Sequence, residues 1–116
     1  MLVTRLYPDE QGESHFQDIE IPLTDHGDIG QLSETVKATG IIFRTTSPNY
    51  DYDWHHAPRR QYIIILEGTV EITVSDGEKR VFSNGDVILV EDTTGKGHKS
   101  RCPDGKLRKS IFVTLD

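Results

Sequence analysis

The residues of this chain that are best suited to chemistry are gathered in the stretch 53–61. Within these nine positions the sequence places an aspartate, two histidines, two arginines and a glutamine. An apolar run, residues 62–66, follows directly, and a short run of this kind between turn residues is typical of a strand covered on both faces. Polar groups at the mouth of a buried strand are typical of a ligand site in a small β-barrel. We therefore expect a ligand-binding site in this stretch.

Side-chain alternation predicts which of these groups share a face. In an extended segment Asp53 and His55 point to one side, while Tyr52 and Trp54 point to the other. The two aromatic side chains could stack on a substrate ring or pack the end of the barrel. His56 is expected to be a histidine of the pocket rim or of the surface rather than a direct metal ligand.

Two consecutive arginines, Arg59 and Arg60, offer bidentate recognition of an anionic substrate. Consecutive strand residues point in opposite directions, so at most one of the two is expected to face the pocket. The other is expected to pair with an acidic residue on the surface.

The length and charge of the chain limit the classes of function. A chain of 116 residues corresponds to one domain, 1–116, with room for one hydrophobic core. The formal net charge of -6 has the wrong sign for a phosphate backbone, and the basic residues of the C-terminal quarter are not interleaved with aromatic residues. We interpret those basic residues as solvated strand edges and expect no nucleic-acid partner.

Hydropathy and cysteine content give further limits. No apolar run approaches the roughly 20 residues that span a bilayer, and the N-terminal residues lack the apolar core of a secretory signal. We therefore expect a cytoplasmic protein without membrane association. Cys102 is the only cysteine, so neither an intrachain disulfide nor a cysteine-rich zinc site can form. Any metal ion must use His, Asp, Glu or Gln side chains.

Short strands separated by turn residues run through most of the sequence. Val70, Ile72 and Val74 alternate with polar residues and are expected to face inward. An Asp-Gly turn at 75–78 predicts one hairpin, and residues 103–106 predict a second hairpin near the C-terminus. Residues 24–40 are expected to be mostly irregular. Roughly nine short strands without a convincing helix predict an all-β sandwich or barrel.

Two motifs in the middle half of the chain resemble those of the cupin superfamily. Gln61, six further residues and Gly68, preceded by a histidine in an extended segment, resemble the first cupin motif, in which a glutamate usually stands at the glutamine position. The glycine and aspartate at 85–86, followed by an apolar strand, a loop and the Gly-His pair at 97–98, resemble the second motif. The resemblance implies a single-domain antiparallel jelly-roll β-barrel. Small single-domain bacterial cupins of this type mostly lack an assigned reaction.

The resemblance also implies a set of metal ligands. His98 would supply the ligand of the second motif, and Gln61 replaces the usual glutamate by a neutral donor, which lowers the expected metal affinity. The broken His-x-His pair can be aligned so that His56 alone is the ligand, or so that Asp53 and His55 both are, which strand alternation favours. A mixed oxygen and nitrogen site suited to Fe(II), Mn(II), Ni(II) or Zn(II) would then consist of Asp53, His55, Gln61 and His98. The alternative is a metal-free pocket in which the same groups hydrogen-bond a ligand, and no organic cofactor is expected.

Three functional classes remain open. The first is an isomerase, epimerase, lyase or dehydratase acting on a sugar-like or keto-acid substrate, with a metal ion as Lewis acid or His55 or His98 as general base. The second is a mononuclear non-haem iron dioxygenase, whose two histidines and one carboxylate would be His55, His98 and Asp53. The third is a non-catalytic ligand-binding module.

The apolar run at 63–66 predicts a homodimer. One apolar face of this strand can be covered by the interior of the barrel, but a barrel of this size cannot also cover the other face. The cupin resemblance implies the same assembly.

Overall fold

The computed structural model describes residues 1–116 and consists almost entirely of β-strands. Its six-stranded sheet contains, in spatial order, β2 (Ser14–Glu20), β1 (Leu2–Pro8), β10 (Val87–Val90), β7 (Gln61–Glu67), β12 (Arg108–Thr114) and β5 (Gly40–Thr46). Its four-stranded sheet contains β6 (Asp51–His55), β11 (His98–Arg101), β8 (Val70–Val74) and β9 (Lys79–Phe82). A small hairpin consists of β3 (Thr24–Asp25), the 3-10 helix η1 (Gly27–Ile29) and β4 (Gln31–Leu32). No helix in the structure has the length and apolar character needed to cross a membrane.

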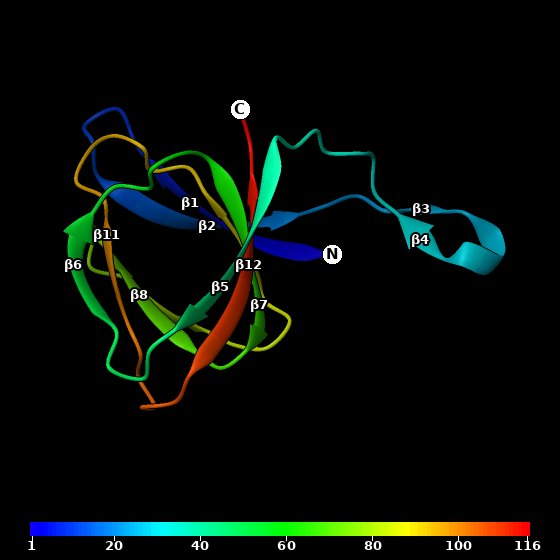
Figure 1. Ribbon diagram of the computed structural model, residues 1–116. Helices are drawn as coiled ribbons and strands as arrows, with labels where there is room; N and C mark the ends of the chain where they lie inside the picture. The colour runs from blue at the N-terminus through cyan, green and yellow to red at the C-terminus, as the bar shows by residue number, and fades with distance from the viewer.

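The two larger sheets face each other, with β8 and β11 on one side of the molecule and β7 and β12 on the other (Figure 1). This arrangement confirms the predicted all-β jelly-roll fold. One strand pair departs from the antiparallel expectation, because β1 runs parallel to β10 with Leu6 opposite Val90. These strands are far apart in the sequence, so no tight turn constrains their relative direction.

The hydrophobic core lies between the two sheets. Val70, Ile72 and Val74 of β8 are all buried, as their alternation with polar residues predicts. From the opposite sheet, Leu6 and Ile88 contribute side chains with no exposed surface. Branched aliphatic residues pack well on a pleated sheet surface, so these positions favour the strands in which they stand.

The two predicted hairpins have different outcomes. β8 and β9 pair around the turn at 75–78, which confirms the first. The second is wrong, because β11 pairs with β6 and β8 whereas β12 pairs with β5 and β7, so residues 102–107 cross from one sheet to the other. Gly68 makes the adjacent crossing from β7 to β8, with a φ of 97° and no room for a side chain beside the carbonyl of Leu107. Turn residues alone do not distinguish a hairpin from a crossing, because both need the same local backbone conformations.

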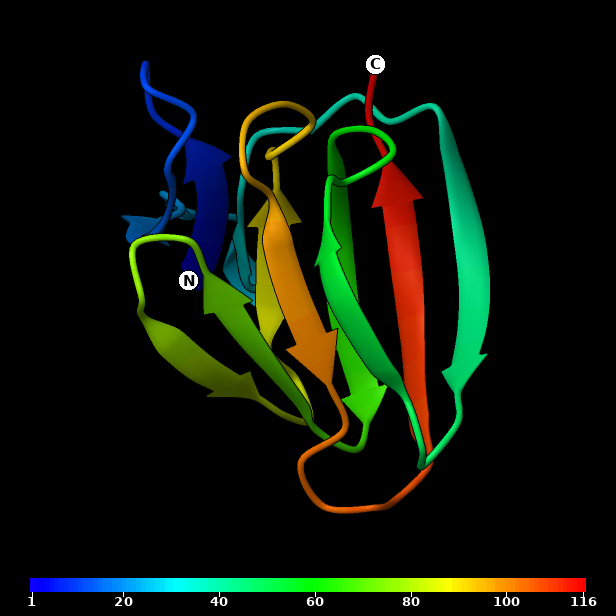
Figure 2. The same ribbon diagram turned by 90° about the vertical axis from the view of Figure 1, so that its left-hand side faces the viewer.

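Residues 22–39 form an arm that projects away from the two sheets (Figure 1). Its strands β3 and β4 pair only with each other, and they are two residues long. Ile29, Leu32 and Val36 of the arm are exposed. Figure 2 shows the edge strand β5, which follows the arm, running beside β12 along its full length.

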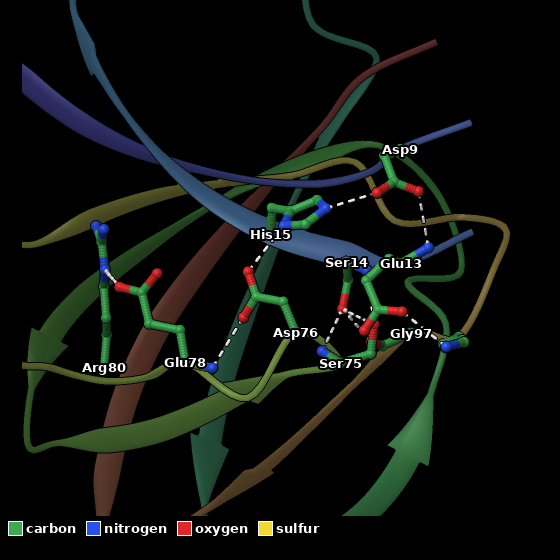
Figure 3. A network of polar contacts seen from close by, with 10 residues as sticks. Asp9, Glu13, Ser14, His15, Ser75, Asp76, Glu78, Arg80 and Gly97 are labelled. Atoms are coloured by element: carbon green, nitrogen blue, oxygen red, sulfur yellow. Dashed lines mark hydrogen bonds and ion pairs between the residues drawn. The ribbon is translucent and has the colours of Figure 1, made fainter. Parts of the chain in front are cut away.

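A charged network on the surface joins two turns from opposite sheets (Figure 3). The imidazole of His15 in β2 lies between two carboxylates, with Nε2 2.7 Å from Oδ2 of Asp9 and Nδ1 2.7 Å from Oδ2 of Asp76. These two contacts raise the pKa of His15, that with Asp9 most strongly. Asp9 lies in the turn after β1 and Asp76 in the turn after β8, so protonated His15 links a turn of one sheet to a turn of the other.

Candidate functional site

A cavity of about 320 Å³ lies between the two sheets. Ten of its nineteen lining residues are hydrophobic, and the rest include histidine, arginine, glutamine and tyrosine side chains. Small-molecule sites have volumes of about 300–1,000 Å³, largely apolar walls and a few polar groups. The cavity therefore has the size and character of a site for a small organic molecule.

His98 is buried at the start of β11 and lines this cavity. Its Nδ1 lies 2.5 Å from Oδ2 of Asp92, a carboxylate with no exposed surface. An ionised carboxylate can only accept, so Nδ1 carries a hydrogen and donates it, and Nε2 is an acceptor when the imidazole is neutral. Carboxylates hold both general-base and metal-binding histidines in this way, fixing the tautomer and the orientation of the ring.

The glycine before His98 allows the imidazole to approach a second one. Gly97 has a φ of 74°, and a side chain at this position would collide with the carbonyl of His55. The pairing of β11 with β6 places His98 directly opposite His55. Their ring centroids are 4.4 Å apart.

His55 is held in the same tautomer by a different acceptor. Its Nδ1 donates to the backbone carbonyl of Asp53 at 2.7 Å, which leaves Nε2 without a hydrogen. Burial lowers the pKa of His55 below its ordinary value, so this imidazole is neutral at neutral pH. His55 and His98 therefore each present an acceptor nitrogen within one site.

Gln61 lies at the start of β7, is buried, and lines the same cavity as the two histidines. Its Oε1 has no hydrogen-bond partner in the protein. A buried carbonyl oxygen of this kind costs free energy unless a ligand or an ion meets it. Three of the four predicted metal ligands, His55, Gln61 and His98, are thus brought to one cavity.

The fourth predicted ligand, Asp53, is not at the cavity, which corrects the expectation from strand alternation. A β-bulge in β6 inserts one extra residue between Tyr52 and His55 where the strand pairs with β11. Tyr52 and His55 consequently both line the cavity, and their ring centroids are 4.0 Å apart. The side chain of Asp53 is exposed and accepts a hydrogen bond from the backbone N–H of Trp54 at 2.9 Å.

Trp54 and His56 are both exposed. The ring of Trp54 lies outside the cavity, with the ammonium of Lys99 5.5 Å from a ring centroid, so Trp54 is not placed to stack on a bound molecule. His56 lies at the rim, as expected, and its Nε2 contacts the backbone carbonyl of Gly95.

The arginines at the cavity are not the predicted ones. Arg59 is exposed, and Arg60 pairs with Glu91, with Nε 2.8 Å from Oε2. Neither lines the cavity. Its lining contains instead Arg44 of β5 and Arg108 of β12.

Three residues of the site were missed from the sequence. Asp92 lies in the loop between the apolar strand and the Gly-His pair of the second motif, and an acid six residues before that histidine is a usable signal. Arg108 was counted among the basic residues of the surface. Arg108, Ser110 and Phe112 are spaced two residues apart, so they share one face of the strand, and all three line the cavity. This spacing is the signal in the sequence for an inward-facing arginine. For Arg44, which follows an apolar run, we find no signal in the sequence that would have separated it from a surface residue.

The facing sheets, and a cavity lined by His55, Gln61 and His98, define a protein of the cupin class. A model of the EutQ-like cupin domain matches residues 41–106, which is more than half of the chain. The chain belongs to this family, and the resemblance recognised from the two motifs is confirmed.

Three individual proteins resemble the chain in sequence or in structure. Over 70 residues the chain is 29% identical to the oryzines biosynthesis cluster protein J of Aspergillus oryzae, a match that covers 60% of this chain and only 37% of that protein. The crystal structure of the conserved protein SPY1581 of unknown function from Streptococcus pyogenes superposes with a TM-score of 0.53 at 20% identity, covering 72% of this chain and 69% of that one. Protein NMB1881 from Neisseria meningitidis superposes with a TM-score of 0.52 at 18% identity, covering 70% and 79%. At these identities the two structures are evidence for the fold alone.

Proposed function

We propose that this cupin is an enzyme that binds a polar or anionic small molecule in its cavity and moves a proton on it, with His98 as the general base. The proposal depends mainly on the 2.5 Å contact between Nδ1 of His98 and the fully buried carboxylate of Asp92. Proton transfer by a positioned imidazole is the shared step of isomerases, epimerases, lyases and dehydratases that act next to a carbonyl group.

Each residue of the site has a distinct role in this proposal. Nε2 of His98 takes a proton from a carbon beside the substrate carbonyl, and the resulting imidazolium is stabilised by Asp92. Neutral His55 leaves His98 free of a neighbouring positive charge. The apolar wall excludes water, which strengthens the interaction between the imidazolium and the carboxylate.

A second candidate is a metal-assisted form of the same chemistry, favoured by the unpartnered Oε1 of Gln61. This oxygen and the two acceptor nitrogens of His55 and His98 are donors that fit Fe(II), Mn(II), Ni(II) or Zn(II), although none of them carries a charge. When bound, such an ion would polarise a substrate carbonyl as a Lewis acid. A histidine bound to metal cannot also accept a proton, so this candidate removes His98 from the role of base.

The iron dioxygenase alternative is less favoured by the geometry. It requires a carboxylate beside two histidines. Asp53 is exposed outside the cavity, and Asp92, although it contacts His98, does not line the cavity.

We further propose that the protein is a homodimer whose interface is the outer face of the six-stranded sheet. Phe43 and Ile41 of the edge strand β5 are 73% and 56% exposed. Phe43 lies opposite Ile111, which lies opposite Ile64, so apolar side chains continue across three strands. A continuous apolar face of this kind, exposed on β5 and half-buried on β12 and β7, is typical of a protein interface, and a second copy would cover it.

Deuterium incorporation tests the proton-transfer proposal without knowledge of the product. Keto acids, hydroxy acids and sugar acids are incubated with the protein in D2O, and loss of the proton signal beside the carbonyl is followed by NMR. We expect a compound whose exchange is accelerated by the wild type, is lost in His98→Gln, and survives treatment with a chelator.

The other outcomes separate the alternatives. Exchange that disappears on chelation and returns with added metal would support the metal-assisted candidate. Binding without exchange for every compound would contradict catalysis and leave the non-catalytic binding module. His26→Gln, a substitution in the exposed arm, is the matched control and should exchange at the wild-type rate.

A further inference from the structure

Arg108 is a buried cation without an anionic partner. Its residue is 5% exposed, and no carboxylate lies within ion-pair distance. Its contacts are long ones, from Nη1 to the carbonyl of Thr69 at 3.3 Å and from Nη2 to Oγ1 of Thr46 at 3.5 Å. Burial lowers the pKa of Arg108, yet a guanidinium stays charged in proteins, so its charge remains uncompensated.

A second arginine stands beside it. The guanidinium carbons of Arg44 and Arg108 each lie 5.2 Å from the centroid of the Tyr50 ring, and that of Arg44 also lies 5.5 Å from the ring of Phe112. Like Arg108, Arg44 makes no ion pair with a carboxylate. Two neighbouring cations in a largely apolar cavity repel each other unless an anion lies between them.

The other partly buried arginines of the chain do have carboxylate partners. Arg5 and Arg60 share Glu91, and Arg80 pairs with Asp18 and Glu78. The two arginines that lack a partner are therefore the two that line the cavity.

A buried hydroxyl lies near the same arginines. Ser110 stands opposite Arg44 in the pairing of β12 with β5, and its Oγ has no hydrogen-bond partner. Ser110 also lines the cavity. Arg44, Arg108 and Ser110 together offer unused hydrogen-bond donors at one end of the cavity.

The imidazoles lie at the other end. On β12, Thr114 is opposite Gln61, and Arg108 stands six residues earlier, which is roughly 20 Å along an extended strand. Between these ends the β7 side of the wall is apolar, with Ile63 and Ile65 facing the cavity, whereas the opposite sheet contributes Tyr52 and Ser100. The cavity thus has donors at one end, an apolar middle, and the unpartnered Oε1 of Gln61 with two acceptor nitrogens at the other end.

We propose that the ligand is an elongated monocarboxylate, whose carboxylate lies between Arg44 and Arg108 and whose apolar body extends toward His98. A planar carboxylate matches the fork of a guanidinium, and the only helix, η1, lies in the arm, so no helix N-terminus offers a phosphate site here. A polyhydroxylated sugar would leave hydroxyl groups unpaired against the branched wall. That the reacting group lies at His98 rests on the proposed function, whereas the carboxylate site does not.

Calorimetric titration with matched ligands tests the carboxylate site. The probes are straight-chain carboxylates from butanoate to decanoate and 3-phenylpropanoate, each compared with its neutral primary amide, and with a phosphate monoester of similar length. We expect the carboxylates to bind roughly tenfold or more tightly than their amides, because the amide leaves the guanidinium charge unpaired. Affinity should rise with chain length until the apolar wall is filled.

Substitutions identify the groups responsible. Arg108→Gln and Arg44→Gln should remove the preference for carboxylate over amide, while continued amide binding shows that the cavity is still folded. Arg59→Gln, which alters an exposed arginine outside the cavity, is the matched control and should keep the full preference. Equal binding of carboxylate and amide by the wild type, loss of preference in Arg59→Gln alone, or tighter binding of the phosphate monoester would overturn the proposal.

The same titrations separate this inference from the proposed function. His98→Gln should keep the preference for carboxylate over amide, because that preference is set by the two arginines, and should lose the exchange activity. Carboxylate binding without proton exchange in the wild type would contradict the general-base proposal and leave the carboxylate site standing. Exchange on a neutral compound, with no preference for carboxylates, would support the general-base proposal and contradict the carboxylate site.

Discussion

Oδ2 of Asp92 and Nδ1 of His98 lie 2.5 Å apart, and the carboxylate of this pair has no exposed surface. The backbone carbonyl of Asp92 also accepts a hydrogen bond from the N–H of Ala57 at 3.1 Å. Asp92 therefore contacts both the histidine of the second motif and the loop that follows His55. This one residue, the second after the end of β10, connects the two motifs of the family.

Asp92→Asn tests the orienting role of this carboxylate. Asparagine has nearly the same shape but can present N–H to Nδ1, which would move the hydrogen of His98 to Nε2 and remove the acceptor from the cavity. We expect the exchange rate to fall by a factor on the order of 10² or more, with carboxylate affinity nearly unchanged. Glu91→Gln alters the neighbouring carboxylate outside the cavity and should keep the exchange rate; an equal loss in both variants would contradict the role given to Asp92.

Gln61→Glu tests whether the site can hold a metal ion. A charged oxygen in place of a neutral one should tighten binding of Mn(II) or Zn(II) by roughly tenfold or more, and His98→Ala should abolish it. Titration calorimetry measures the metal affinity of the purified variants, and elemental analysis measures their metal content. His56→Ala, at the rim, is the control. Equal metal content in the wild type, Gln61→Glu and His98→Ala would show that a metal site, if present, does not use these residues.

His15 predicts a pH dependence of stability. Its pKa is raised in the folded state by Asp9 and Asp76, so its contribution is fully present below the unfolded pKa of about 6.5 and is lost as the pH rises through the folded pKa. The melting temperature of His15→Gln should therefore lie further below that of the wild type at a pH of about 5.5 than at about 9. Thermal unfolding of both proteins across this range measures the difference, with His26→Gln as the control. A gap that widens with rising pH would contradict the network in Figure 3.

Phe43→Arg tests the homodimer. A charged side chain on the edge strand β5 would be desolvated in the proposed interface, so the variant should be a monomer at micromolar concentration while the wild type is a dimer. Light scattering after size-exclusion chromatography measures the mass. Val81→Arg, at an exposed apolar position on β9 of the other sheet, should remain a dimer. A monomeric wild type would refute the assembly.

Leu6→Ala tests the position of the core. Leu6 has no exposed surface and packs in the core cluster, so its truncation should reduce the free energy of unfolding by about 2–5 kcal/mol. Leu2→Ala, an exposed leucine on the same strand, should change it by less than about 0.5 kcal/mol. Chemical denaturation of the two variants gives the comparison. Similar losses in both would mean that β1 does not contribute its inner face to the core as described.

Local patterns in the sequence determined the fold class. Alternation in Val70, Ile72 and Val74, the Asp-Gly turn after them, and the spacing of the two motifs are properties of short segments, and each has its predicted counterpart in the structure. The second hairpin was wrong because residues 103–106 have turn chemistry whether the next strand returns to the same sheet or crosses to the other. Which sheet a strand joins depends on distant partners, as the pairing of β12 with β5 and β7 shows.

The site was only partly determined by the sequence. The motifs brought His55, Gln61 and His98 together, because their positions follow from the order of the strands. Only the tertiary structure decided against Asp53, since a single bulge in β6 shifts the side-chain alternation by one residue and places Tyr52 and His55 on the same cavity. The tertiary structure also determines which arginine is available to a ligand. Arg60 is paired with Glu91 outside the cavity, whereas Arg108 lines the cavity and has no carboxylate partner, although it is distant in sequence from the motif. The environment of a charge is set by residues from other strands, and this is why only the folded chain shows which arginine is free to bind a ligand.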